Sequence, residues 1–313
     1  MKKIFIIYLL LITSTVFSQK TIIRGIALDS TKGRNRVMIT LNDTVNKLVS
    51  DTTHKLKDLN KIWDNKKYVV HTDENGNFKI KAKITDTLAF QSYRHIKKKI
   101  AVIDILKLKP IKIVLEPEVC EKYILCKDSF PTHYVFIGKK IKINYAKEKY
   151  YCNVISFDSK FDAEYQVVEN IYGKLPNDIV KFVVFDHNGR PEFGKFETVL
   201  LFISKYCGEL FHQKYQFYAL YKTEDNRLAS PYNTFDYSRL DSTSTIKPEI
   251  IKFKEQVEID VKNTSQEYIE KWYPAPFYKI ENGKAIAVYG NYVPELLELK
   301  KQTVLKERKI ILE

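Results

Sequence analysis

The six histidines are the first residues whose chemistry could support catalysis or metal binding. They are His54, His71, His95, His133, His187 and His212. No two of them have the H-x-x-x-H or H-E-x-x-H spacing that places both imidazoles on one face of a helix around a metal. A site assembled in space from His187 and His212 is an alternative, but two ordinary loop histidines are the simpler interpretation. The pattern predicts no metal and no cofactor.

Sequence motifs for other enzyme chemistry are also missing. There is no G-x-S-x-G nucleophile motif and no glycine-rich phosphate-binding loop. The turn at 73–77 resembles the start of a calcium loop, but the twelfth position from Asp73 is Ile84 instead of glutamate. We therefore expect a protein that is not an enzyme, with an enzyme whose site is not recognisable in the sequence as one alternative.

The chain has four cysteines, which could form disulfides in an oxidising compartment. Cys120 and Cys126 do not have the spacing of a zinc knuckle. Four cysteines allow three pairings, and the sequence does not choose among them. We favour a bond from Cys207 to either Cys120 or Cys126, and Cys152 completes the set.

The first 18 residues have the pattern of a cleaved signal peptide. Lys2 and Lys3 precede an apolar run over 4–12, and Val16-Phe17-Ser18 gives a small-residue ending before Gln19. The run is too short for a spanning helix, which needs about 20 residues, although an uncleaved anchor is the alternative. No later stretch approaches that length. The sequence predicts an exported protein that is periplasmic, outer-membrane-associated or secreted.

The mature chain is strongly basic. Removing residues 1–18 takes two of 52 basic residues and no acidic one, which lowers the net charge from +14 to +12. An exported protein rarely meets nucleic acid, so we expect no nucleic-acid partner. We expect instead an envelope protein or an acidic glycan or lipid surface as the partner. The alternative is that surface lysines only maintain solubility, and the run at 97–99 is expected on an exposed strand edge.

The region from Gln19 to about Pro117 is predicted to contain short strands that form a sandwich. Residues 44–66 interrupt it as a polar insertion with the spacing of one short helix at Leu56, Leu59, Ile62 and Trp63. Alternating apolar and β-branched residues indicate the strands. The expected strands are 21–29, 36–41, 68–72, 78–82, 88–93, 96–103 and 111–115.

Four segments of this region share a family pattern. They are Gly25-Ile26-Ala27-Leu28-Asp29, Val70-His71-Thr72-Asp73-Glu74-Asn75-Gly76-Asn77-Phe78, Thr87-Leu88-Ala89-Phe90 and Ile111-Lys112-Ile113-Val114-Leu115-Glu116. Together they resemble the carboxypeptidase-regulatory-like β-sandwich of exported Bacteroidetes-type proteins. Tyr93-Arg94-His95 and the insertion at 44–66 depart from the family. The resemblance implies an Ig-like sandwich with no active site of its own.

Residues 118–232 form a second strand-rich block. Tyr134-Val135-Phe136-Ile137-Gly138-Lys139 and Tyr206-Cys207-Gly208 are its most distinctive segments. They resemble the netrin and tissue-inhibitor-of-metalloproteinase type of OB-fold, which implies a β-barrel. The family's inhibitory N-terminal cysteine is missing, because a whole domain precedes residue 118. The expected strands are 134–141, 151–157, 163–169, 179–185 and 215–222.

Residues 233–313 are expected to combine helices with one hairpin. Pro248–Ile259 and Glu295–Lys306 are the predicted helices, and residues 277–289 the predicted hairpin. The aromatic cluster of Trp272, Tyr273, Phe277 and Tyr278 lies at the start of that hairpin. Exposed, it would be a recognition surface; buried, it would join the C-terminal segment to the barrel, and burial is favoured because it removes apolar surface from water.

The sequence thus predicts a mainly β protein with an Ig-like sandwich, an OB-like barrel and a mixed helical C-terminal segment. Its predicted parts are 1–18 (signal peptide), 19–117 (sandwich), 118–232 (barrel) and 233–313 (C-terminal segment). The expected function is non-catalytic binding or scaffolding in the cell envelope, with an unknown ligand. A proteinase-inhibitor-like role for the barrel is the second hypothesis, and fold alone does not choose between them.

Overall fold

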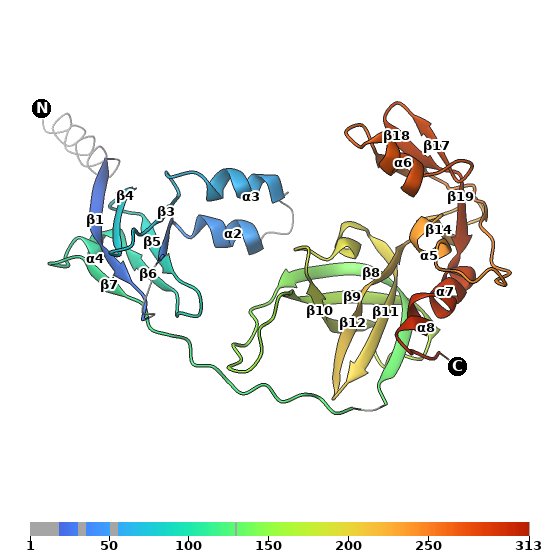
Figure 1. The fold of residues 1–313 in the computed structure, drawn as a ribbon, viewed down its shortest axis with the longest axis horizontal. Helices are drawn as coiled ribbons and strands as arrows, with labels where there is room; N and C mark the ends of the chain where they lie inside the picture. The colour runs from blue at the N-terminus through green and yellow to red at the C-terminus, as the bar shows by residue number, and fades with distance from the viewer. Residues whose placement is uncertain (1–18, 31–35, 51–55, 129, 313) are drawn as a thin grey trace, which may run out of the picture. The chain divides into compact units, whose positions relative to one another are not determined.

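The fold of this chain is mainly β, as the sequence predicts. The computed structural model describes residues 19–30, 36–50, 56–128 and 130–312. The predicted signal peptide, residues 1–18, lies outside the described residues. The architecture comprises a β-sandwich, a closed five-stranded OB-like barrel and a C-terminal segment of short strands and helices (Figure 1).

The chain divides into two compact units. The first holds the residues up to Ile124 together with Lys147–Ile155, and the second holds Leu125–Ala146 together with the chain from Ser156 onward. The first unit contains the sandwich, and the second contains the barrel and the C-terminal segment.

Two β-sheets with one shared apolar core form the sandwich. Their strand orders are β4-β1-β7 and β3-β2-β5-β6. Ile23 and Phe78 of the first sheet are buried with Ile39 and Phe90 of the second. Burial of such side chains, at ~25 cal/mol per Å² of apolar surface, holds the sheets together. The strands are β1 (Lys20–Leu28), β2 (Met38–Leu41), β3 (Val69–His71), β4 (Asn77–Lys83), β5 (Thr87–Gln91), β6 (Lys98–Ala101) and β7 (Lys112–Val114).

The strand β6 lies at the edge of its sheet, where the sequence predicts the lysine run. The lysines at 97–99 are paired with Asp43 and Glu116. The predicted strand over 96–103 is too long, because the chain turns into helix α4 (Val102–Ile105). Val102 and Ile105 are both buried, and their spacing of three residues brings both to the core on one helical face.

The insertion contains two helices instead of the one expected. They are α2 (Thr44–Ser50) and α3 (Leu56–Trp63). Val45 of α2 is buried against Met38 and Val69, and Ile62 of α3 packs on the same small cluster. This cluster anchors the insertion beside β3.

The barrel is closed in the order β10-β12-β11-β8-β9. β10 and β12 pair in parallel, and the other neighbours pair antiparallel, which gives a Greek-key barrel. The ladder between β8 and β9 shifts register next to Gly138, where a side chain would meet Phe136 and Tyr165 at 2.8 and 3.0 Å. The strands are β8 (Thr132–Tyr145), β9 (Ser159–Tyr172), β10 (Ile179–Asp186), β11 (Thr198–Tyr206) and β12 (Glu209–Ala219).

Two features of the barrel differ from the sequence prediction. Residues 151–157 form no strand and belong to the connection between β8 and β9. β11 was not predicted at all. Its residues are apolar on both faces, so they lack the alternation that reveals a half-buried strand.

The C-terminal segment also corrects one helix. The helix predicted over 248–259 is wrong, because the chain there is extended and contributes two short strands. Ile251 is buried and Lys252 exposed, which is strand-like alternation. The predicted hairpin is present, with Asn282 and Gly283 at φ 50° and 74° in its turn. The remaining strands are β13 (Tyr221–Lys222), β14 (Leu228–Pro231), β15 (Glu249–Ile250), β16 (Glu258–Asp260), β17 (Tyr278–Glu281), β18 (Lys284–Ala287) and β19 (Tyr289–Tyr292).

Helices of the C-terminal segment cover the outside of the barrel. Leu296 and Leu299 are buried against Leu200 and Phe202 of β11. The predicted final helix is present but breaks at Thr303 into two pieces. The helices of the second unit are η1 (Glu192–Lys195), α5 (Thr234–Tyr237), α6 (Gln266–Trp272), α7 (Val293–Gln302) and α8 (Val304–Glu307).

A buried ion pair joins this helical layer to the barrel. Lys300 Nζ of α7 lies 2.8 and 3.0 Å from the carboxylate oxygens of Asp236 in α5. The Tyr218 hydroxyl of β12 donates to the same carboxylate at 2.6 Å. The Lys300 and Asp236 side chains are only 4% and 0% exposed. Burial lowers the pKa of Lys300, and the Asp236 carboxylate opposes this shift.

Substituting Lys300→Met should strongly destabilise the second unit. The change leaves the Asp236 carboxylate buried with only neutral donors, which costs about 3–5 kcal/mol. Urea unfolding followed by circular dichroism would measure this loss in the free energy of unfolding. Lys301→Met is the matched control, because the Lys301 ion pair with Glu298 is partly exposed and worth under about 1 kcal/mol. Equal losses in the free energy of unfolding from the two substitutions would contradict the stabilising role of the Asp236–Lys300 ion pair.

Candidate functional site

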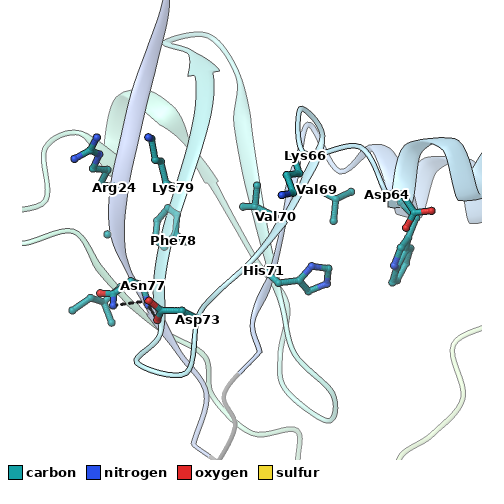
Figure 2. A pocket seen from close by; sticks show the side chains of 13 residues that line it. Arg24, Asp64, Lys66, Val69, Val70, His71, Asp73, Asn77, Phe78 and Lys79 are labelled. Atoms are coloured by element: carbon teal, nitrogen blue, oxygen red, sulfur yellow. Dashed lines mark hydrogen bonds between the residues drawn. The ribbon is translucent and has the colours of Figure 1, made fainter.

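A groove in the sandwich is the strongest candidate for a ligand site. It has a volume of about 1150 Å³ and is lined by residues of β1, β3 and β4 and of the end of α3. β3 and β4 are each the terminal strand of their sheet. The groove therefore lies where the sandwich core is open at its side, between two strand edges (Figure 2).

The walls of the groove are predominantly basic. Arg24 and Lys79 stand beside each other on β1 and β4, while Lys66 and His71 lie across Val70 from them (Figure 2). Arg24 and Lys79 are direct cross-strand partners, so their side chains project from the same face of the sheet. The arrangement concentrates positive charge along an accessible concave surface.

Among the described residues, neither carboxylate of the groove forms an ion pair with these cations. Asp73 Oδ1 accepts the backbone N–H groups of Asn75 and Asn77 at 2.9 and 2.7 Å. The side chain of Asn77 donates to Asp73 Oδ2 at 2.9 Å, and this bond is the main cause of the lowered pKa of Asp73. The carboxylate thus stabilises its own turn, in which Gly76 has a positive φ of 79° that glycine adopts without a steric penalty. Asp64 is the other carboxylate of the lining.

The basic surface continues from the groove over the outer face of the sheet. Lys20 pairs across the strands with Lys83, and Lys81 stands opposite Ile22. Lys112 of β7 lies beside Ile26. In the described part of the chain, no carboxylate forms an ion pair with any of the six cations of this surface. We call these six the basic face: Lys20, Arg24, Lys79, Lys81, Lys83 and Lys112.

Trp63 adds an aromatic surface to the groove. It is the last residue of α3 and remains 43% exposed, although Ile62 beside it packs into the cluster that anchors the insertion. An indole held by an anchored helix offers a flat apolar face to a ligand. The groove can therefore combine ring stacking with charge recognition, but it presents no nucleophile with an adjacent base.

The aromatic cluster predicted at 272–278 is largely internal. Tyr278 is buried, and its hydroxyl donates to the Tyr232 carbonyl at 2.6 Å. Phe277 is half-buried and stacks on the Tyr232 ring with centroids 3.8 Å apart. Tyr273 and Trp272 are also half-buried. The cluster packs the small C-terminal sheet against Tyr232, beyond the last barrel strand, and not against the barrel core.

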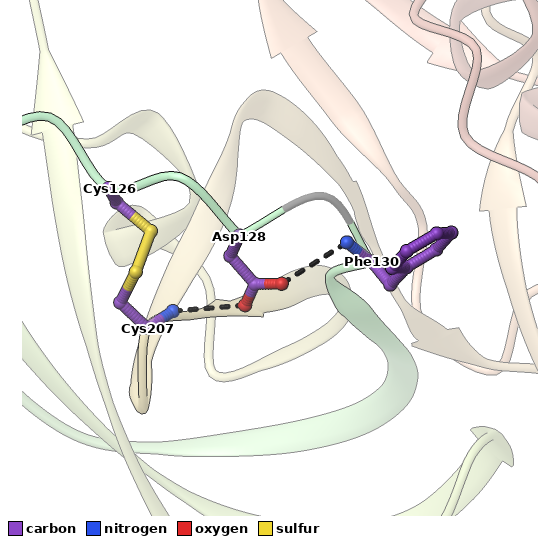
Figure 3. The surroundings of a disulfide bond; sticks show 4 residues. All are labelled: Cys126, Asp128, Phe130 and Cys207. Carbon is purple, nitrogen blue, oxygen red and sulfur yellow. Dashed lines mark hydrogen bonds between the residues drawn. A yellow bond between two sulfur atoms is a disulfide. The ribbon is translucent and has the colours of Figure 1, made fainter.

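The four cysteines form two disulfides, Cys120–Cys152 and Cys126–Cys207. The second is one of the two bonds to Cys207 that the sequence left open. Around it, Asp128 accepts the N–H of Cys207 at 3.1 Å and the N–H of Phe130 at 3.1 Å (Figure 3). The disulfide and the carboxylate together fix the turn between β11 and β12, where Cys207 has φ 45°.

The barrel contains a serine–histidine pair that the sequence did not reveal. Ser204 Oγ lies 2.6 Å from His133 Nδ1 and accepts a hydrogen bond from Gln213 Nε2 at 2.7 Å. Ser204 is completely buried, so no substrate can reach its hydroxyl. Gln213 in turn accepts from Arg308 at 3.0 Å. The pair is part of a hydrogen-bond chain that ties the C-terminal residues to the barrel.

A second hollow, of about 460 Å³, lies in the second unit and is lined in part by Lys300 of the buried ion pair. Lys300 lines this hollow, but its side-chain nitrogen is already paired with the Asp236 carboxylate. Arg239 and Arg308 lie at its rim and are themselves engaged, by Glu307 and by Gln213. Its cations therefore have protein partners, in contrast to those of the basic face.

The sequence did not identify the groove. Arg24, Trp63, Lys66 and Lys79 come from separate elements, and only the fold brings them together. One usable signal was present, because Lys79, Lys81 and Lys83 alternate along β4 without an acidic residue among them. In the described ranges, no group of three or more His, Cys, Asp or Glu residues could hold a metal ion.

No protein-family model and no curated protein matches the chain. The chain is mainly β, with a sandwich that has a basic groove at its open side and with a closed barrel. Among the described helices, none has the length and apolar character required to cross a bilayer.

One titratable group of the barrel should make stability depend on pH. His212 is buried, its Nε2–H donates to the Gln216 carbonyl at 2.9 Å, and burial lowers its pKa from 6.5 to about 4. Between these values the unfolded chain binds a proton that the folded barrel does not. Stability is therefore full above pH 6.5 and falls by about 3 kcal/mol as the pH drops toward 4.

Substituting His212→Gln should remove this part of the pH dependence. Urea unfolding at pH 7 and pH 4.5 would compare the decrease in the free energy of unfolding between the two proteins. His187→Gln is the control, because the His187 side chain is 60% exposed. A wild-type decrease no larger than that of His212→Gln would show that His212 is not responsible.

Proposed function

We propose that this chain is an exported, non-enzymatic binding protein of the cell envelope that holds an acidic envelope component on its sandwich. The basic face carries this proposal. Six cations on one sheet, none of them in an ion pair with a carboxylate of the described ranges, create a positive potential that attracts an anionic surface or polymer. In the second hollow, by contrast, arginine and lysine side chains are already engaged by the protein.

Export is supported by the signal-peptide pattern and by the two disulfides, because disulfides persist mainly in oxidising compartments. The two-sheet sandwich and the turn at Asp73 are compatible with the resemblance to the carboxypeptidase-regulatory-like family, which implies no active site in this domain. The burial of Ser204 and the engagement of Lys300 support a non-catalytic role. In this proposal the protein is periplasmic, outer-membrane-associated or secreted.

A proteinase-inhibitor-like role for the barrel is the second candidate. The observation that favours it is the turn between β11 and β12, which the Cys126–Cys207 disulfide and Asp128 hold at one end of the barrel. Rigid, exposed turns bind tightly because little conformational entropy is lost on binding. The resemblance to the netrin and tissue-inhibitor type of barrel points the same way, without its N-terminal cysteine.

The proposed function predicts that binding to acidic envelope material depends on the basic face. The triple variant Lys79→Gln, Lys81→Gln, Lys83→Gln of the mature chain, residues 19–313, should bind purified envelopes about tenfold more weakly. Three lost contacts at about 0.5 kcal/mol each give this factor. Co-sedimentation over a range of salt concentrations would measure it, and the wild-type affinity should fall as salt rises.

The matched control removes the same charge from the second unit, in the variant Lys252→Gln, Lys254→Gln, Lys262→Gln. These three lysines are exposed, so the control should bind like the wild type. Equal weakening in both variants would mean that net charge alone drives binding and would overturn the role of the basic face. Salt-resistant capture of a protease by the unmodified protein would favour the inhibitor-like alternative.

A further inference from the structure

The groove beside the basic face has features that charge attraction alone does not require. Its walls carry cations on both sides, and the exposed indole of Trp63 adds a flat apolar surface to the lining. The face of a sugar ring is a row of C–H groups, which packs well against an aromatic ring, while its acidic substituents extend sideways toward cations. The groove matches both parts of such a ligand.

We propose that the groove binds an acidic polysaccharide, with Trp63 stacking on a sugar ring and Arg24, Lys66 and Lys79 pairing with its acidic groups. This inference rests on the proposed function, because it names the chemical class of the acidic component. Asp64 at the groove can accept hydrogen bonds from sugar hydroxyl groups. Lys79 belongs to both the groove and the basic face, so one ligand can occupy both.

The dimensions of the site favour a polymer over a small molecule. The volume of about 1150 Å³ exceeds the range of ~300–1000 Å³ typical of small-ligand pockets. Beyond the groove, Lys81 and Lys83 continue the line of cations along β4. Successive outward side chains on a strand are about 7 Å apart, which places charge repeatedly along an extended chain.

Two other acidic or extended partners fit the site less well. A bilayer is flat on this scale, whereas the indole and Lys66 line a concave groove. A peptide strand added to the edge of β4 would meet Lys79, Lys81 and Lys83 in succession, and lysines on an edge strand oppose such pairing. The acidic polysaccharide is therefore the occupant that the charge and shape favour.

The test compares three anionic probes by isothermal titration calorimetry with the mature chain, residues 19–313. The probes are an oligogalacturonate of about ten sugars, polyglutamate of equal charge, and vesicles of phosphatidylcholine with phosphatidylglycerol. Trp63→Ala should weaken oligogalacturonate binding about tenfold and leave polyglutamate binding unchanged, because only the sugar uses the indole. Trp63→Phe should recover part of the loss.

Tyr93→Ala is the matched control, because Tyr93 is an exposed aromatic residue of the first unit that does not line the groove. Thermal unfolding of each variant verifies that the sandwich is intact. If Trp63→Ala leaves oligogalacturonate binding unchanged, or weakens both polymers equally, the polysaccharide inference is overturned while the proposed function stands. Tighter binding to the vesicles than to either polymer would also overturn it, in favour of a membrane surface. Binding to none of the three would contradict both proposals.

Discussion

The second unit depends on one strand that is buried on both faces. Leu201 and Ile203 of β11 point into the barrel, and Leu200 and Phe202 point outward. Closure of the barrel buries the inward side chains, but the outward side chains would remain exposed to water if no other element covered them. The α7 helix provides that cover, and the Asp236–Lys300 pair fixes it in place. The barrel and the C-terminal segment therefore depend on each other for stability.

The cations of the two units differ in whether carboxylates pair with them. In the second unit the buried cation Lys300 is paired with the Asp236 carboxylate, which also accepts a hydrogen bond from the Tyr218 hydroxyl. In the first unit the lysines at the β6 edge are paired with Asp43 and Glu116, so that edge is neutralised. The basic face has no such carboxylates in the described ranges. Like charges gathered on one sheet reduce stability unless solvent or a ligand screens them, and the proposed acidic partner would provide this screening.

The sequence predicted the parts of the fold that follow from local patterns. Alternating apolar residues indicated the strand that is β4, and the turn expected at 73–77 and the hairpin expected over 277–289 are both present. It failed where tertiary burial replaced the local pattern. β11 has no alternation because both its faces are covered, and the residues around Ile251 have helical as well as strand spacing.

The candidate site could not be predicted, for a different reason. Arg24 and Lys79 become neighbours only through the pairing of β1 with β4, and Trp63 belongs to an insertion whose path no local rule determines. The four cysteines show the same limit, since their spacing allowed three pairings and the fold selected one. Residues that act together across distant elements are visible only once the sheets are assembled.

Hydrogen exchange of the mature chain, residues 19–313, followed by mass spectrometry tests the central claim most directly. The account holds that an acidic ligand is bound by the groove and the basic face of the sandwich. With saturating oligogalacturonate, exchange should slow in peptides covering β4 and residues 63–71, and remain unchanged over the barrel. Protection confined to the barrel or the C-terminal segment, with none in the sandwich, would contradict the account.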